Sequence, residues 1–177
     1  MSATAKILPH YTVEEWEKWE DKWELIEGIP YAMSPLPVPL HQTICGNLFS
    51  ILKNALEDCK QCKVYLPLDY KISEDTILQP DILVVCGEIK NKYLDFPPAL
   101  VAEILSPSTA LKDRHSKFSI YEQQGIFYYL IIDPVKNILE IYALNDKKYI
   151  LQKIEENFTF SFNEECSPDV SFVDLFK

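Results

Sequence analysis

Two carboxylates in apolar surroundings are the first residues of the sequence that could carry out chemistry. Asp81 precedes the apolar run Ile-Leu-Val-Val, and Glu103 lies within Leu-Val-Ala-Glu-Ile-Leu. A carboxylate in a buried strand is costly unless it is paired or bound to a metal ion. Because two such acids on consecutive strands would repel one another, a shared divalent cation is the expected remedy. Asp81 and Glu103 are therefore candidate metal ligands.

A basic side chain follows these acids in the next predicted helix. Asp113, Lys117 and Tyr121 are spaced four residues apart, so they share one helix face. Lys117 neighbours the apolar Ile120 and Tyr121, which favours a side chain directed at the sheet rather than at water. The spacing also allows a plain Asp113–Lys117 surface pair, worth only about 0.3–0.5 kcal/mol. Tyr121 by itself is more typical of core packing than of catalysis.

The first half of the chain should supply two helices, a hairpin and two further strands. Thr12 and Glu15 form a capping box at a helix start, and Gly28 suits the tight turn of a hairpin. Apolar periodicity and turn residues then predict, in chain order, a hairpin of Trp23–Ile26 and Ile29–Met33, an extended Ser34–Leu40, a helix over His41–Glu57, and strands at Val64–Tyr70 and Ile77–Cys86.

The second half should add a helix between strands. The predicted elements are a strand at Leu100–Leu105, a helix from Ser108 or Thr109 to about Gln124 ended by Gly125, strands at Ile126–Ile132, Ile138–Ala143 and Tyr149–Ile154, and a packed tail at Asp169–Phe176. This order predicts an α/β layered fold with an N-terminal hairpin and additional C-terminal strands. The length of 177 residues suits a single domain over 1–177.

Charge and hydropathy limit the function classes. With 27 acids against 17 bases the net charge is −10, whereas nucleic-acid binders usually carry a basic face. The acidic total argues against tight, sequence-independent binding to long DNA. No stretch approaches the roughly 20 apolar residues of a membrane helix, and the N-terminus has no signal-peptide pattern. A cytoplasmic protein that does not bind a membrane is expected.

The cysteines support the same compartment. There are five, an odd number, which predicts free thiols in a reducing cytoplasm. Cys59 and Cys62 form a C-x-x-C pair, but a structural zinc site would need two more ligands at matching spacing. Two ordinary cysteines at a helix end are the favoured interpretation.

A set of segments in fixed order resembles a known family. They are Glu24-Leu-Ile-Glu-Gly28, His41-Gln42, Leu78-Gln-Pro-Asp-Ile-Leu-Val-Val85 and Ala102-Glu-Ile-Leu-Ser-Pro-Ser-Thr109, followed by Asp113, Lys117, Tyr121, Gly125 and Ile131-Ile-Asp-Pro134. Together they resemble the Uma-two family of restriction endonuclease-like proteins, a branch of the PD-(D/E)XK nuclease superfamily. The resemblance runs from Tyr11 to about the C-terminus. It implies a restriction endonuclease-like core, over about residues 11–143, with a central mixed β-sheet flanked by helices.

The resemblance also implies an activity and a site. Asp81 and Glu103 would be metal ligands, with the main-chain carbonyl of Ile104 as a third, and the ion would be Mg²⁺ or Mn²⁺. The superfamily's usual lysine falls at Leu105, whereas this family moves it to the next helix, where Lys117 matches. The implied function is that of a metal-dependent endonuclease hydrolysing phosphodiester bonds in DNA, with Asp81, Glu103 and Lys117 as catalytic residues.

The sequence also offers accessory candidates for the site and an alternative function. Glu24, His41 and Asp113 are accessory candidates, although a solvent acid, a helix-start residue and a surface pair describe them about as well. Ser106 and Ser108 should shape a loop rather than act as nucleophiles, because no G-x-S-x-G frames them. The expected partner is DNA or another nucleic acid, and a homodimer is compatible with the sequence. The alternative function, favoured by the acidic charge, is a non-catalytic nuclease-fold binding or assembly module.

Overall fold

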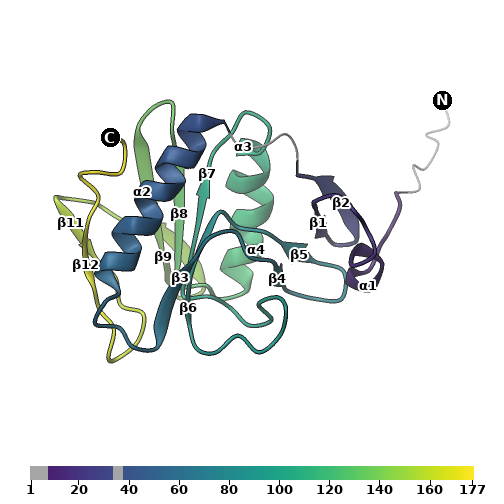
Figure 1. The fold of residues 1–177 in the computed structure, drawn as a ribbon, viewed down its shortest axis with the longest axis horizontal. Coiled ribbons are helices and arrows are strands. Elements are labelled where there is room, and N and C mark those ends of the chain that lie inside the picture. The colour runs from purple at the N-terminus through teal and green to yellow at the C-terminus, as the bar shows by residue number, and fades with distance from the viewer. Residues whose placement is uncertain (1–7, 34–37) are drawn as a thin grey trace.

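The computed structural model describes residues 8–33 and 38–177, and a six-stranded sheet forms its centre (Figure 1). The strand order is β10-β9-β8-β7-β6-β3. Its members are β3 (Cys62–Tyr65), β6 (Ile82–Cys86), β7 (Leu100–Ile104), β8 (Tyr128–Asp133), β9 (Ile138–Asn145) and β10 (Lys148–Leu151). Strands β7 and β8 are parallel and the other neighbours are antiparallel, so the predicted mixed sheet is confirmed.

A smaller sheet lies beside the first and carries the N-terminal hairpin. Its order is β2-β1-β5-β4, from β1 (Trp23–Ile26), β2 (Ile29–Ala32), β4 (Tyr70–Lys71) and β5 (Ile77–Leu78). The hairpin turns at Glu27 and Gly28, which both have positive φ, 49° and 74°. Thr12 caps the short helix α1 (Val13–Trp16) with the predicted capping box.

Helices cover both faces of the six-stranded sheet. One face packs against α2 (Pro39–Ala55), with β11 (Asn157–Thr159) and β12 (Asp169–Ser171) beside it. The other face packs against a continuous helical segment of α3 (Ala110–Lys112), a π-helical turn (Asp113–Lys117) and α4 (Phe118–Gln123). Among the described residues no helix is long and apolar enough to span a membrane.

Alternation along β7 sets the direction of Glu103. Ala102 and Ile104 belong to the core on the α2 face, whereas Val101 and Leu105 belong to the core on the α4 face. Since strand side chains alternate, Glu103 shares the face of Val101 and Leu105. The acid therefore points toward the helical segment that carries Lys117.

Prolines split two of the predicted strands. The Val64–Tyr70 prediction becomes β3 and β4, and the Ile77–Cys86 prediction becomes β5 and β6, with each pair divided between the two sheets. Pro67 and Pro80 lie at these breaks, where a residue without an N–H cannot continue a ladder. Asp81 consequently stands where the chain passes from the small sheet into the large one.

The extended segment predicted over 34–40 is only partly described. Residues 34–37 lie outside the described ranges. Pro39 begins α2 rather than prolonging an extended strap, because proline is well tolerated in the first turn of a helix. Helix α2 thus starts two residues earlier than the apolar pattern predicted and places His41 in its first turn.

The prediction of free thiols is wrong for four of the five cysteines. Cys59 is bonded to Cys166 and Cys62 to Cys86, and Cys45 remains a free thiol. Cys62 and Cys86 are register partners on neighbouring antiparallel strands, and the C-terminal segment folds back to bring Cys166 to the end of α2. The two members of the C-x-x-C pair have different partners, which spacing along the chain could not indicate.

Candidate active site

Lys117 lies at the centre of a buried cluster of carboxylates. Its Nζ is 2.8 Å from Glu103 Oε1, 2.9 Å from Glu24 Oε1 and 3.6 Å from Asp113 Oδ1, and its side chain is only 4% exposed. The surface-pair interpretation of Asp113 and Lys117 is therefore wrong. Both residues belong to the π-helical turn, a distortion that is frequent at functional sites.

Glu103 is held on the sheet by two donors from the helical segment. Tyr121 Oη donates to Glu103 Oε1 at 2.9 Å, beside the bond from Lys117. Burial raises the pKa of Glu103 well above its usual value; Lys117 opposes this, and the charges of Asp113, Asp81 and Glu24 add to it. An additional cation beside Glu103 would therefore stabilise its charged form.

Asp81 stands next to Glu103 across the β6–β7 ladder. Ile82 pairs with Ala102, so the register continued by one residue sets Asp81 opposite Glu103. The Ile104 amide donates to Asp81 Oδ2 at 2.8 Å. These contacts gather Asp81, Glu103 and the Ile104 peptide at one end of the central strands.

His41 approaches the same carboxylate from the first turn of α2. Its Nε2 is 3.3 Å from Asp81 Oδ2. The hydrogen bond to Asp81 raises the pKa of His41 despite partial burial, and the Ile104 backbone contributes in the same direction. His41 therefore belongs to the site rather than serving only to start the helix.

Glu24 reaches the cluster from the small sheet. It is 1% exposed, so the interpretation as a solvent acid on the hairpin edge is wrong. Its Oε1 accepts from the Gln79 amide at 2.9 Å and from Lys117, and its Oε2 is paired with Lys112. Burial alone would raise the pKa of Glu24, but Lys117 and Lys112 outweigh it and hold the pKa low.

Asp113 carries a buried carboxylate oxygen that accepts no hydrogen bond from the described residues. Its side chain is 2% exposed, and its Oδ1 is buried without a hydrogen-bond partner among the described residues. Burial raises the pKa of Asp113, opposed by Lys117. With Asp81, Glu103 and Glu24, it gives the site more carboxylates than cations.

The structure thus brings together every residue that the sequence singled out, namely Asp81, Glu103, Ile104, Lys117, Glu24, His41 and Asp113. Sequence reasoning missed Lys112 as the outer partner of Glu24, since 88 residues separate them. Ser106 and Ser108 bond one another through their hydroxyls at 3.0 Å, as loop-shaping residues would.

A metal ion at this site would have to rely partly on the backbone. Within residues 8–33 and 38–177, no group of three or more His, Cys, Asp or Glu side chains is arranged to hold a metal ion. Two carboxylates and one main-chain carbonyl form a smaller set of oxygen donors, which hard divalent cations complete with water. Asp81, Glu103 and the Ile104 carbonyl could supply that set.

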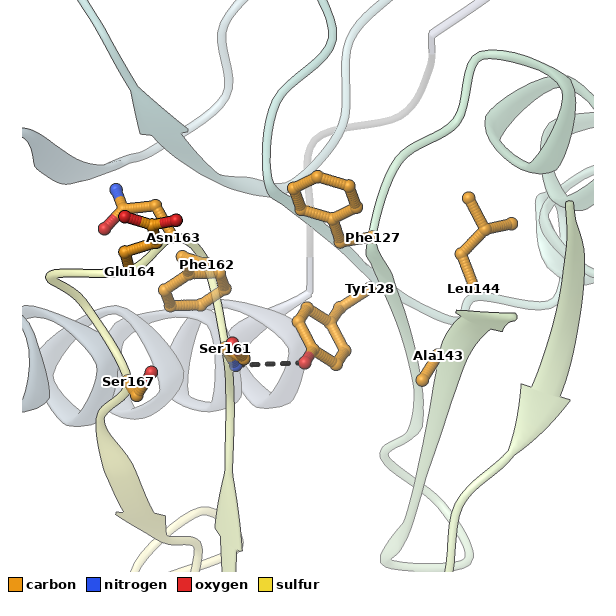
Figure 2. A pocket seen from close by; sticks show the side chains of 9 residues that line it. All are labelled: Phe127, Tyr128, Ala143, Leu144, Ser161, Phe162, Asn163, Glu164 and Ser167. Carbon is orange, nitrogen blue, oxygen red and sulfur yellow. Dashed lines mark hydrogen bonds between the residues drawn. The ribbon is translucent and has the colours of Figure 1, made fainter. Parts of the chain in front are cut away.

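One hollow among the described residues lies away from this site. It has a volume of about 480 Å³ and is lined by Phe127, Tyr128, Ala143, Leu144, Ser161, Phe162, Asn163, Glu164 and Ser167 (Figure 2). The backbone N–H of Ser161 donates to Tyr128 Oη at 3.0 Å, and both residues line this hollow. Because Tyr128 is the register partner of Leu100, the hollow lies at the opposite end of β7 from Glu103.

Comparisons with known proteins agree with this architecture. The model of the Uma2 (Uma-two) family, described as "Putative restriction endonuclease", matches residues 11–175. The uncharacterized protein slr1290 of Synechocystis sp. is 30% identical over 148 residues, covering 78% of this chain and 77% of that protein. The uncharacterized protein sll1609 of the same organism is 29% identical over 175 residues, covering 91% and 96%.

A solved structure shares the fold. It is that of "a putative nuclease belonging to DUF820" from Anabaena variabilis, which aligns with a TM-score of 0.73 at 22% identity. The alignment covers 93% of this chain and 97% of that one. The restriction endonuclease-like fold is thereby confirmed. Because the family model spans nearly all of the described residues, the chain belongs to the Uma2 family of restriction endonuclease-like proteins.

Proposed function

We propose that this protein is a metal-dependent endonuclease that hydrolyses phosphodiester bonds in DNA. The observation that carries the proposal is the contact of Lys117 with Glu103, at 2.8 Å, beside Asp81, the residue that precedes the neighbouring strand β6. Two carboxylates that a divalent cation can share, next to a buried ammonium, are the parts that metal-assisted hydrolysis needs. Membership of a nuclease-like family supports the same reaction class.

The donor set fits a hard divalent cation such as Mg²⁺ or Mn²⁺. Asp81, Glu103 and the Ile104 carbonyl offer oxygen atoms. Burial raises the pKa of Glu103, and the nearby carboxylates of Asp113, Asp81 and Glu24 raise it further, so a cation beside Glu103 would favour its charged form. When bound, such a cation would polarise a phosphate oxygen and lower the pKa of a water molecule. His41 would hold Asp81 in place from the side of α2.

Lys117 would act on the reacting phosphoryl group. Its ammonium has three donors, which Glu103 and Glu24 now orient, and it can stabilise the charge that develops on the phosphate oxygens. Tyr121 would keep the Glu103 carboxylate in position through its hydroxyl. Neither Lys117 nor Tyr121 needs to be a metal ligand in this scheme.

Cleavage should depend on Asp81. With Mg²⁺ or Mn²⁺, we expect the wild type to cut at least one of single-stranded, double-stranded and branched DNA. Asp81→Ala should lose at least about a thousand-fold in rate, since the cation loses a ligand and the water its activation. Gel-based single-turnover assays measure this. Asp146→Asn, at an exposed turn, is the matched control and should cleave normally. Equal rates for Asp81→Ala and wild type would disprove the assignment.

Metal binding should also be visible without cleavage. Adding Mn²⁺ or Mg²⁺ at about 100 times its dissociation constant stabilises the folded state by about 2.7 kcal/mol. For a chain of this size, the melting temperature should rise by roughly 5–10 °C. Glu103→Gln should abolish most of that rise, because the amide is a poor ligand. A rise of equal size in Glu103→Gln would place the cation at other residues.

The acidic composition supports a second candidate function. A net charge of −10 favours a non-catalytic binding or assembly module that retains the nuclease fold. Such a module would show the metal-dependent rise in melting temperature but no cleavage of any DNA form. The cytoplasmic location, the homodimer and the single-domain organisation stay predictions, which fractionation, light scattering and limited proteolysis can test.

A further inference from the structure

An exposed aromatic ring stands at the outer edge of the carboxylate cluster. Tyr31 on β2 is the register partner of Glu24 on β1, so both side chains lie on one face of the small sheet. Lys112 contacts the Glu24 carboxylate, and its Nζ lies 5.6 Å from the centroid of the Tyr31 ring. Tyr31 is 37% exposed, so its ring meets both the buried cluster and solvent.

Charges alternate along a path from the sheet to this ring. Glu103 contacts Lys117, Lys117 contacts Glu24, and Glu24 contacts Lys112. The first three side chains are buried, with exposures of 5% at Glu103, 4% at Lys117 and 1% at Glu24, and exposure rises to 15% at Lys112. This series of ion pairs extends from the proposed reacting centre toward the surface and ends at Lys112, beside the Tyr31 ring.

The Tyr31 ring lies outside the packed core. Tyr31 is absent from the three apolar clusters of the described residues, and within those residues its hydroxyl makes no side-chain hydrogen bond. An ammonium carries three N–H donors, so the Glu24 carboxylate does not exhaust those of Lys112. A partly exposed ring beside a lysine suits a ligand that has both a flat π-system and an anionic group.

We propose that Tyr31 and Lys112 form a nucleotide subsite, in which the ring stacks on an unpaired base and the ammonium contacts an adjacent phosphate. The proposal rests on the proposed function and names the form of its substrate. Stacking on aromatic side chains requires a base with a free face, which single strands and frayed ends offer and intact duplexes do not. The subsite therefore selects DNA that is single-stranded near the cleaved bond.

Binding of a short fluorescent single-stranded oligonucleotide to the full chain tests the subsite directly. Fluorescence anisotropy is measured with Ca²⁺ in place of Mg²⁺, so that binding is read without cleavage. Tyr31→Leu should weaken binding about ten-fold, as the loss of one stacked base predicts. Tyr31→Trp should bind more tightly than Tyr31→Leu. Lys112→Gln should weaken binding and reduce the slope of log K against log salt by about 0.7, the value for one single-strand phosphate contact.

Matched controls separate the subsite from general surface effects. Phe127 is an exposed aromatic residue, 50% accessible, at the hollow shown in Figure 2 and so at the other end of the strands. Lys136 is an exposed lysine paired with Asp133 at 3.5 Å, as Lys112 is paired with Glu24. Phe127→Leu and Lys136→Gln should leave oligonucleotide affinity and salt slope unchanged. Thermal melting of every variant confirms that it is folded.

The outcomes distinguish the subsite from the proposed function. If the wild type cleaves DNA and Tyr31→Leu matches it in affinity and KM, the subsite proposal is wrong and the nuclease proposal is retained. If no DNA is cleaved but Tyr31→Leu and Lys112→Gln still weaken oligonucleotide binding, the subsite stands and the nuclease proposal fails. A wild type that does not bind the oligonucleotide, or binds the duplex form more tightly, overturns the subsite.

Discussion

Replacing Lys117 by alanine is expected to abolish most cleavage and to destabilise the fold at the same time. The substitution leaves Glu103, Glu24 and Asp113 facing one another without their shared cation. Breaking a buried ion pair in this way typically costs about 3–5 kcal/mol. Loss of a donor that stabilises developing charge lowers the rate by about 10²–10³-fold. Denaturant unfolding and single-turnover cleavage measure the two effects.

The two effects can be separated because the metal compensates for one of them. Mn²⁺ binding should restore part of the lost stability, since it neutralises Glu103, yet it should not restore the rate. Rates are therefore compared under metal-saturated conditions in which melting shows both proteins to be folded. If folded Lys117→Ala cleaves as fast as wild type, Lys117 only balances charge and its catalytic role is wrong.

Adding a lysine on the strand extends the same test. Leu105 follows β7 on the face of Glu103, at the position where the superfamily usually keeps its lysine. Introducing Leu105→Lys into Lys117→Ala should return part of the activity. Leu105 is 8% exposed within the core on the α4 face, so the exchange itself is expected to cost about 2–5 kcal/mol. Leu105→Lys in the wild-type background measures that cost separately.

The sequence predicted the parts of the site that rest on local pattern. An acid in the middle of an apolar strand, as at Glu103, is conspicuous because burial makes it costly. The four-residue spacing of Asp113, Lys117 and Tyr121 gave their shared direction, and the structure keeps it through the π-helical turn. Both signals lie within about one element and need no knowledge of distant contacts.

Long-range pairing was beyond the reach of such patterns. Glu24 forms ion pairs with Lys117 and Lys112, which lie more than eighty residues further along the chain. The residues of its own strand therefore do not indicate that Glu24 is buried. Pro67 and Pro80 each divide one predicted strand into two strands of different sheets, and the apolar pattern runs across both breaks. That division is what sets Asp81 and Glu24 at one junction.

The pairing of the cysteines depends on tertiary structure, because the bonded residues are far apart in the sequence. Reducing the protein should lower its free energy of unfolding by several kcal/mol. The Cys59–Cys166 bond closes 107 residues and the Cys62–Cys86 bond closes 24. Loop-closure entropy predicts about 4–5 kcal/mol for the longer loop and about 3 kcal/mol for the shorter. Cys59→Ser should therefore be more damaging than Cys86→Ser.

Thermal melting with and without a thiol reductant measures this effect, and Cys45→Ser is the matched control because Cys45 is the free thiol. Thiol counting on the purified, unfolded protein should find one reactive cysteine. Five thiols, with no influence of reductant on melting, would show that these bonds do not form and that the original prediction of free thiols was right. Both disulfides lie near the C-terminal end of α2, whereas His41 and Asp81 meet at its first turn. Reduction should accordingly lower stability while the protein that remains folded keeps the geometry of the candidate active site.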